Sequence, residues 1–346
     1  MIDIRNPLGL AGVEFVEFAT PDVDYMDGVF LELGFSRLKR HRTKTITLYQ
    51  QNGIQFLLND EVQGSARDFS SLHGPSISAM GWRVSDAGYA LNEAVKRGAI
   101  ASADSDKDLS YPAIYGIGGS LIYFIDRYAG SDSIYESDFV VLKEPQCVPD
   151  KGFIAIDHLT NNVHKGTMAD WVSFYKDVFG FTEAHYFDIR GKKTGLTSYA
   201  LRSPDGSFCI PINEGDEGTS QIEEYLRDYA GPGIQHLAFL TEDILRSLDA
   251  LEGSSIETLD IRDSYYETTF NRFPPQSDEL REKIKRHQVL IDGNQDGLLM
   301  QIFTRNIFGP IFFEIIQREG CRGFGEGNFQ ALFESIERDQ ERRQAI

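Results

Sequence analysis

An α+β protein of four units is predicted for this chain of 346 residues, each unit running β-α-β-β-β and two units lying in each half. Three observations support the prediction. Strand-like and helix-like runs recur in one order at a period of roughly 60–80 residues, as in proteins with internal repeats. The helices carry apolar residues at positions i, i+3, i+4 and i+7, which form one face. The first helix of each half also ends in the same pair, Gly34-Phe35 and Gly180-Phe181, and glycine commonly ends helices.

The first half contains two of these units. In the first unit, a strand precedes a helix that has Met26 and Phe30 on its apolar face. Runs of β-branched and aromatic residues then predict three strands, with Asn52-Gly53 as the hairpin turn between the last two. The second unit repeats this order. The predicted strands of the first half are 13–19, 35–39, 45–50, 54–59, 78–84, 111–115 and 120–125.

The second half repeats the pattern with a clearer periodicity. Its first helix has Trp171 and Tyr175 on one face, and its second has Ile244 and Leu248. A longer polar insert follows the second helix, so the last three strands are separated from it. The predicted strands of the second half are 153–160, 184–189, 197–202, 207–212, 233–240, 289–292, 298–304 and 311–317.

Changes in composition divide the chain into domains. A stretch with Pro145 and Pro149 and one short apolar run separates the two halves. The chain ends in a predicted helix with Phe329 and Phe333 on one face, preceded by a glycine-rich hinge. We expect an N-terminal structural domain over residues 1–135, a linker over 136–150, a catalytic domain over 151–327 and a terminal helix over 328–346.

The overall charge and the cysteines restrict the partners and the compartment. The formal charge is −19 and the pI is near 4.8, so we expect neither nucleic acid nor an anionic membrane as a partner. The sequence has no long apolar run and no apolar leader, which predicts a soluble protein. Cys147, Cys209 and Cys321 are few, odd in number and far apart. This usage indicates free thiols in a reducing compartment, and we expect the cytoplasm.

One carboxylate interrupts the most apolar run of the sequence, residues 308–318 (FGPIFFEIIQR). Glu314 lies in its middle, and a buried, unpaired carboxylate costs several kcal/mol, so a partner is expected. Arg318 lies on the same strand face by period-2 counting and is the simpler partner. A metal ion is the alternative.

Two histidines lie at positions that match across the second half. His158 and His236 each fall in the first strand of a unit, and 78 residues separate His158 from His236 and His236 from Glu314. A single strand histidine is more often a core residue than a ligand. Three such residues at matched positions suit the 2-His-1-carboxylate set that binds non-haem Fe(II) and leaves positions open for O2. The matched positions in the first half, Glu17, Gly81 and Phe124, offer no such set, so catalysis is expected in the second half.

Six motifs, in the order IDHLTNN, PINE, GPGIQHLAF, LLMQIFT, GPIFFEIIQR and GFGEGNF, resemble those of 4-hydroxyphenylpyruvate dioxygenases in the vicinal oxygen chelate superfamily. The resemblance covers essentially the whole chain. It implies two open β-barrel-like domains with the C-terminal helix as a gate over the active site. It also implies Fe(II) bound by His158, His236 and Glu314, with 4-hydroxyphenylpyruvate and O2 converted to homogentisate and CO2 in tyrosine breakdown.

The resemblance further implies a substrate pocket. Amides and a hydroxyl suit a phenol and a carboxylate without adding charge, and aromatic rings can stack on the substrate ring. Without the resemblance, each phenylalanine would be read as a core residue. The implied substrate-binding residues are Ser198, Asn213, Gln221, Gln235, Gln301, Phe303, Phe312, Phe324, Asn328 and Phe329.

Three alternative functions stay open from the sequence. A 4-hydroxymandelate synthase would share the fold, the iron and the substrate but oxidise the side chain. A ring-cleaving dioxygenase of the extradiol type is disfavoured by the chain length and by the C-terminal GFGEGNF. A metal-free binding module on the same scaffold would bind no iron and take up no O2. Members of the family are commonly oligomers, so a homodimer or homotetramer is expected.

Overall fold

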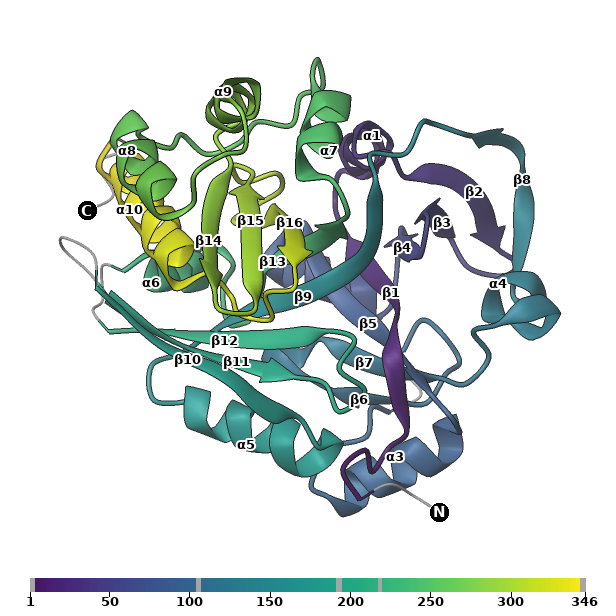
Figure 1. The fold of residues 1–346 in the computed structure, drawn as a ribbon. Helices are drawn as coiled ribbons and strands as arrows, with labels where there is room; N and C mark the ends of the chain where they lie inside the picture. Colours follow the sequence, from purple (N-terminus) through teal and green to yellow (C-terminus); the bar gives the residue numbers. More distant parts are fainter. Residues whose placement is uncertain (1–3, 104–106, 191–194, 217–219, 343–346) are drawn as a thin grey trace.

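Two curled eight-stranded sheets form the protein, one from each half of the chain (Figure 1). The computed structural model describes residues 4–103, 107–190, 195–216 and 220–342. The strands of the first sheet are β1 (Leu10–Ala19), β2 (Ser36–His41), β3 (Ile46–Gln51), β4 (Ile54–Asn59), β5 (Ser76–Val84), β6 (Ala113–Tyr115), β7 (Leu121–Ile125) and β8 (Phe139–Gln146). Those of the second are β9 (Phe153–Val163), β10 (Thr182–Arg190), β11 (Gly195–Arg202), β12 (Cys209–Gly215), β13 (Gly233–Thr241), β14 (Leu290–Asn294), β15 (Gly297–Phe303) and β16 (Phe312–Glu319).

The two sheets share a plan that confirms the predicted α+β repeat. The first sheet has the order β6-β7-β5-β1-β4-β3-β2-β8, and the second has β10-β11-β12-β9-β13-β16-β15-β14. In each sheet the first strands of its two units, β1 with β5 and β9 with β13, pair antiparallel at the centre. Each central strand also pairs in parallel with the last strand of its own unit, as β13 does with β16. The centre of each sheet is therefore the junction of its two units.

Each unit has one helix after its first strand. These helices are α1 (Val23–Glu32), α3 (Ala87–Lys96), α5 (Met168–Phe179) and α7 (Ile244–Leu251). Aspartates cap three of them; for example, Asp22 accepts a hydrogen bond from the backbone N–H of Tyr25. The remaining helices are α2 (Ser65–His73), α4 (Ile134–Ser137), α6 (Gln221–Asp228), α8 (Asp263–Arg272), α9 (Asp278–Arg286) and α10 (Glu326–Arg342). Within the described residues, none of the helices combines the length and the apolar character needed to cross a membrane.

The Gly-Phe pairs of the two halves join the sheets to each other. Gly180 adopts a left-handed conformation, with φ of 81°, and ends α5. Phe181, which follows it, packs against Trp82 of the first half at a centroid distance of 5.9 Å. In the same way, Phe35 packs against Phe239 of the second half at 5.7 Å. The two halves therefore share a continuous apolar core.

The second unit differs from the other three because only two strands, β6 and β7, follow its helix. Part of the expected linker, residues 136–150, forms β8, which crosses to the far edge of the first sheet and pairs with β2. Only Phe139 of this strand is buried. Because Val140 and Val141 face solvent, the strand has no apolar alternation by which sequence could predict it.

The strand register corrects the predicted counterparts of the metal ligands in the first half. Glu17 pairs with Ala79 as His158 pairs with Ala238. Leu121 in turn pairs with Ala79, as Glu314 pairs with Ala238. The counterpart of Glu314 is therefore Leu121 and not Phe124, and that of His236 lies near Ile77 and not at Gly81, because the pairing between strands, and not the residue count within a unit, sets which positions match. Among the described residues of the first half, no three side chains form a metal-ligand group.

Glu17, the counterpart of His158, allows a test of whether the first half is structural and binds no metal. Its side chain is buried, Ser78 Oγ donates to Oε1 at 2.9 Å, and Oε2 has no hydrogen-bond partner among the described residues. Burial, with the nearby carboxylate of Asp108, raises the pKa of Glu17 from 4.5 to about 7. The unfolded chain therefore loses this proton at lower pH than the folded protein, and stability falls as pH rises from 4.5 to 7.

We expect Glu17→Gln to remove this loss and to stabilise the protein at pH 8, relative to wild type, by on the order of 3 kcal/mol. At pH 4.5 the two proteins should differ little, because both carry a neutral side chain. Urea denaturation across pH 4.5–8 measures the difference, with Glu252→Gln at an exposed site as control. A difference in unfolding free energy between Glu17→Gln and wild type that does not vary with pH would contradict the raised pKa of Glu17.

Candidate metal centre and substrate pocket

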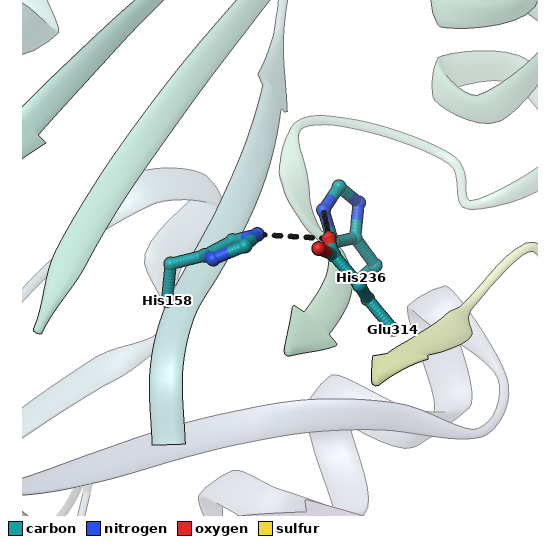
Figure 2. A group of neighbouring side chains, drawn as sticks. All are labelled: His158, His236 and Glu314. Atoms are coloured by element: carbon teal, nitrogen blue, oxygen red, sulfur yellow. Dashed lines mark ion pairs between the residues drawn. The ribbon is translucent and has the colours of Figure 1, made fainter. Parts of the chain in front are cut away.

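Three neighbouring strands at the centre of the second sheet position the predicted ligands. His158 lies on β9, His236 on β13 and Glu314 on β16, and β13 lies between the other two strands. The register sets Ala238 beside both His158 and Glu314. Figure 2 shows the three side chains pointing toward one another from these strands.

The ligand atoms of the three residues converge within the protein interior. The distance from Glu314 Oε2 to His158 Nε2 is 3.1 Å, and to His236 Nε2 it is 3.5 Å. The three ligand atoms lie within 4.8 Å of one another, and all three residues are buried. This spacing is compatible with one ion bound by the three side chains.

Hydrogen bonds of the outer ring nitrogens determine what the histidines present to Glu314. His158 Nδ1 lies 2.7 Å from Asp157 Oδ2, and His236 Nδ1 lies 3.1 Å from Gln235 Oε1. Carboxylate and amide oxygens accept hydrogen bonds, so each Nδ1 atom donates, and Nε2 of each ring is the nitrogen that faces Glu314. Once His158 Nε2 has lost its proton, two nitrogen lone pairs and one carboxylate oxygen converge, and a divalent cation fits this donor set.

The pKa shifts show how strongly the three groups interact. Burial alone would raise the pKa of Glu314, but the two histidines outweigh it and lower that pKa to about 2. Burial opposes the charged form of His158, but the carboxylates of Glu314 and Asp157 raise its pKa to about 9. Burial lowers the pKa of His236. Glu314 is therefore ionised at neutral pH, as a metal ligand must be.

Arg318 does not pair with Glu314, so the simpler prediction was wrong. Its guanidinium instead binds Asp157, with Nε 2.6 Å from Oδ1 and Nη2 2.8 Å from Oδ2. Four residues along a strand span about 13 Å, which places Arg318 beyond Glu314 although both share a face. Arg318, Asp157 and His158 form a hydrogen-bonded series that ends at the metal-ligand group.

Most of the predicted substrate residues line one small cavity next to the three ligands. Its volume is about 20 Å³, room for roughly one water molecule. Rings of Phe324 and Phe329 occupy its side toward α10. The predicted substrate residues that line it are Ser198, Asn213, Gln301, Phe303, Phe324 and Phe329.

The other predicted residues lie just outside this cavity. Gln221, Gln235 and Phe312 line a neighbouring cavity of about 320 Å³. Phe312 also stacks on the ring of His236 at a centroid distance of 4.7 Å. Asn328 is buried behind Gln301 and donates to its Oε1 at 2.8 Å.

Gln301 is occupied by protein groups at both ends of its amide. Its Nε2 donates to Glu314 Oε1 at 2.8 Å, and its Oε1 accepts from Asn328. In this arrangement Gln301 holds the carboxylate of Glu314 in place. Residue 325 has to be glycine, because a Cβ atom at this position would lie 2.6 Å from Gln301 Oε1.

Four further residues line the cavity that the sequence analysis did not name. Three of them could have been found by strand alternation: Thr160 follows His158 by two residues, Ala200 follows Ser198 by two, and Pro211 precedes Asn213 by two. The four residues are Thr160, Phe187, Ala200 and Pro211. Asp157 and Arg318 could not have been found in this way, because their contact joins two strands that do not pair.

Helix α10 closes the open side of the second sheet. It lies between the two edge strands, β10 and β14 (Figure 1). Gln330 Nε2 donates to the carbonyl of Arg190 on β10 at 3.0 Å, and the N–H of Gly327 donates to Asp292 on β14 at 2.9 Å. The helix begins at Glu326, two residues before the predicted start.

Comparisons with known proteins agree with the fold. A family model described as "Hydroxyphenylpyruvate dioxygenase, HPPD, N-terminal" matches residues 4–140. A second, described as "Glyoxalase/Bleomycin resistance protein/Dioxygenase superfamily", matches residues 155–278. The first match covers β1 to β7 of the first sheet, and the second begins in β9 and reaches past β13 of the second sheet.

Relatives match over almost the entire length. Protein MelA of Shewanella colwelliana is 63% identical over 344 residues, 99% of each chain. A 4-hydroxyphenylpyruvate dioxygenase of Pseudomonas aeruginosa is 45% identical over 353 residues, 100% of this chain and 98% of the other. The structure of a mutant 4-hydroxymandelate synthase of Streptomyces coelicolor has the same fold, with a TM-score of 0.80, 23% identity, and coverage of 96% of this chain and 99% of that one. The chain belongs to the 4-hydroxyphenylpyruvate dioxygenase family of the vicinal oxygen chelate superfamily.

Proposed function

We propose that the protein is a 4-hydroxyphenylpyruvate dioxygenase, which converts 4-hydroxyphenylpyruvate and O2 to homogentisate and CO2 in tyrosine breakdown. The observation that supports this most directly is the convergence of three buried ligand side chains, those of His158, His236 and Glu314. The family membership of the chain supports the same assignment. The catalytic domain is then residues 151–327, with the first half as its structural support.

Fe(II) is the cofactor of this proposal, held by His158, His236 and Glu314. This ligand set occupies one face of an octahedral ion, so bound Fe(II) would supply a Lewis acid with open positions for a 2-oxo acid and O2. The hydrogen bonds from Gln301 to Glu314 and from His158 to Asp157 orient two of the ligands. Such outer contacts commonly determine how tightly a site binds its metal.

Asn213 is the proposed partner of the substrate phenol. Its Nδ2 donates to Asn162 at 3.2 Å, but its Oδ1 is buried and has no hydrogen-bond partner among the described residues. Asn213 lines the cavity with Ser198. A phenolic O–H can donate to the amide oxygen, and leaving such a buried acceptor unsatisfied costs about 1–3 kcal/mol.

The C-terminal segment is the proposed gate. A cavity of about 20 Å³ is too small for an aromatic 2-oxo acid, so binding requires that Phe324 and Phe329 move. Phe324 also lines an adjoining cleft of about 510 Å³, which offers a route past the ring. Closure over the bound substrate would exclude water from the reaction. The gate comprises residues 328–346 as predicted, of which 343–346 lie outside the described residues.

The enzyme is proposed to work in a reducing compartment. We assign it to the cytoplasm, since the free cysteines Cys147, Cys209 and Cys321 suit a reducing compartment. Its partners are the small-molecule substrate and O2, without nucleic acid or membrane. A homodimer or homotetramer stays a prediction, which light scattering on the purified protein would test.

Replacing Glu314 by Gln should lower the affinity for Fe(II) by more than about 100-fold, beyond the effect usual for groups that only contact a ligand. The amide removes the negative charge at nearly constant size, so the fold should survive. Anaerobic Fe(II) titration measures the affinity. Glu252→Gln, in the exposed cluster of Asp249, Glu252 and His287, is the control and should bind iron as wild type does. Full iron binding by Glu314→Gln would refute the site.

The reaction itself is tested by loading the protein anaerobically with Fe(II) and adding 4-hydroxyphenylpyruvate and O2. We expect O2 uptake and homogentisate, because several relatives that match at full length, such as the one from Pseudomonas aeruginosa, are named 4-hydroxyphenylpyruvate dioxygenase. Formation of 4-hydroxymandelate would assign the alternative synthase reaction. No O2 uptake with iron bound would exclude both.

Asn213→Ala should weaken anaerobic binding of 4-hydroxyphenylpyruvate to the Fe(II) protein by roughly 5–10-fold, the effect of one hydrogen bond of about 1 kcal/mol. Phenylpyruvate lacks the phenolic O–H, so its binding should change little. Calorimetric titration of both compounds separates the two effects. Equal weakening for both compounds would contradict a phenol contact.

A further inference from the structure

Arg318 has contacts that neither the fold nor the proposed reaction explains. It lies near the end of β16, and its side chain is 17% exposed. Two of its nitrogens bind the Asp157 carboxylate, and the third, Nη1, donates to the carbonyl oxygens of Cys321 and Gly323. The guanidinium carbon also lies 5.4 Å from the ring centroid of Phe324.

The first set of contacts leads to the metal-ligand group. Asp157 Oδ2 accepts both from Arg318 Nη2 at 2.8 Å and from His158 Nδ1 at 2.7 Å. This carboxylate therefore holds the His158 ring in the orientation that directs Nε2 toward Glu314. Arg318 in turn holds the carboxylate, because both of its oxygens accept from the guanidinium.

The second set of contacts leads to the segment that covers the cavity. Residues 320–325 connect β16 to α10, and Phe324 within them lines the cavity and lies 5.6 Å from the His158 ring. Gly325 passes close over Gln301 on the other side. Arg202 Nη2 also donates to the carbonyl of Arg322 at 3.0 Å. Of the contacts that hold this covering segment, those with Arg318 and Gln301 are the ones that lead to the metal-ligand group.

We infer that Arg318 is a positioning residue that couples closure of the covering segment, residues 320–325, to the orientation of His158. A guanidinium is planar, so its position on Asp157 also determines where Nη1 points. Asp157 and the carbonyls of Cys321 and Gly323 therefore cannot shift independently. This inference extends the proposed function, since it assumes a metal ion at the three-ligand site.

The coupling predicts a reciprocal effect between two observables. Metal bound at His158 should reduce opening of residues 320–325, and closure of this segment should strengthen metal binding by the same factor. An arginine that only fastened the end of β16 would show neither effect. Both observables are measured without substrate and without turnover.

The decisive variant is Asp157→Asn, which alters the contact with His158 but touches no atom of the covering segment. Hydrogen exchange of the amides of residues 320–325 is measured without metal and with Fe(II) under anaerobic conditions. We expect faster exchange in the variant than in wild type without metal, and loss of the slowing that Fe(II) causes in wild type. Unchanged exchange in both states would overturn the coupling.

Arg318→Lys provides a second variant that keeps the charge but cannot make the forked contact. We expect it to lower Fe(II) affinity by about 10–100-fold, as for other groups that orient a ligand, and to speed exchange at residues 320–325. Arg286→Lys, at an exposed ion pair with Glu252, is the matched control and should change neither. Wild-type Fe(II) affinity in Arg318→Lys would also overturn the inference.

Thermal unfolding of each variant shows that any effect is local. The outcomes also separate the two proposals. If the wild-type protein binds no Fe(II), the proposed function fails, while faster exchange in metal-free Asp157→Asn would still show that Asp157 and the covering segment are linked. If Fe(II) binds and Asp157→Asn exchanges as wild type does, the coupling fails and the proposed function stands.

Discussion

The convergence of three ligand side chains in a buried site is the constraint on which the second domain depends. His158, His236 and Glu314 direct two ring nitrogens and a carboxylate oxygen toward one point. A buried carboxylate is unfavourable in a medium of low polarity unless a positive charge lies beside it, here a protonated His158 or a metal ion. The convergence is possible only because β9, β13 and β16 are neighbours, so that one residue from each strand reaches the same point. The strand order of the sheet therefore has a direct chemical consequence.

The first domain has the same strand order without this chemistry. Glu17 occupies the place of His158, and Leu121 that of Glu314. The carboxyl group of Glu17 therefore has the hydroxyl of Ser78 and an apolar side chain, Leu121, as neighbours in place of metal ligands. What the first domain supplies is packing. Phe35 contacts the second domain, and Trp82 receives Phe181 from it. These contacts lie on the outer surface of the second sheet and leave its open side to α10.

The open side is closed by a segment that is tied to the metal-ligand group at two points. Gln301 links Glu314 to Asn328 at the start of α10. Arg318 links Asp157, beside His158, to the carbonyls of residues 321 and 323. On the proposed function, a substrate would have to displace Phe324 and Phe329 to enter, and that displacement would disturb groups bonded to two of the three candidate ligands. Access to the cavity and the geometry of the candidate ligands thus depend on one hydrogen-bonded network.

The sequence by itself determined the repeated α+β units, the helix faces and the three candidate ligands, because strand and helix periodicity depend on local spacing. It also determined most of the cavity residues through the family motifs. Only the tertiary structure decided that β8 joins the far edge of the first sheet, that Leu121 rather than Phe124 matches Glu314, and that Arg318 binds Asp157. These features follow from register, bulges and contacts between strands that do not pair, and such long-range geometry leaves no periodic trace in the sequence.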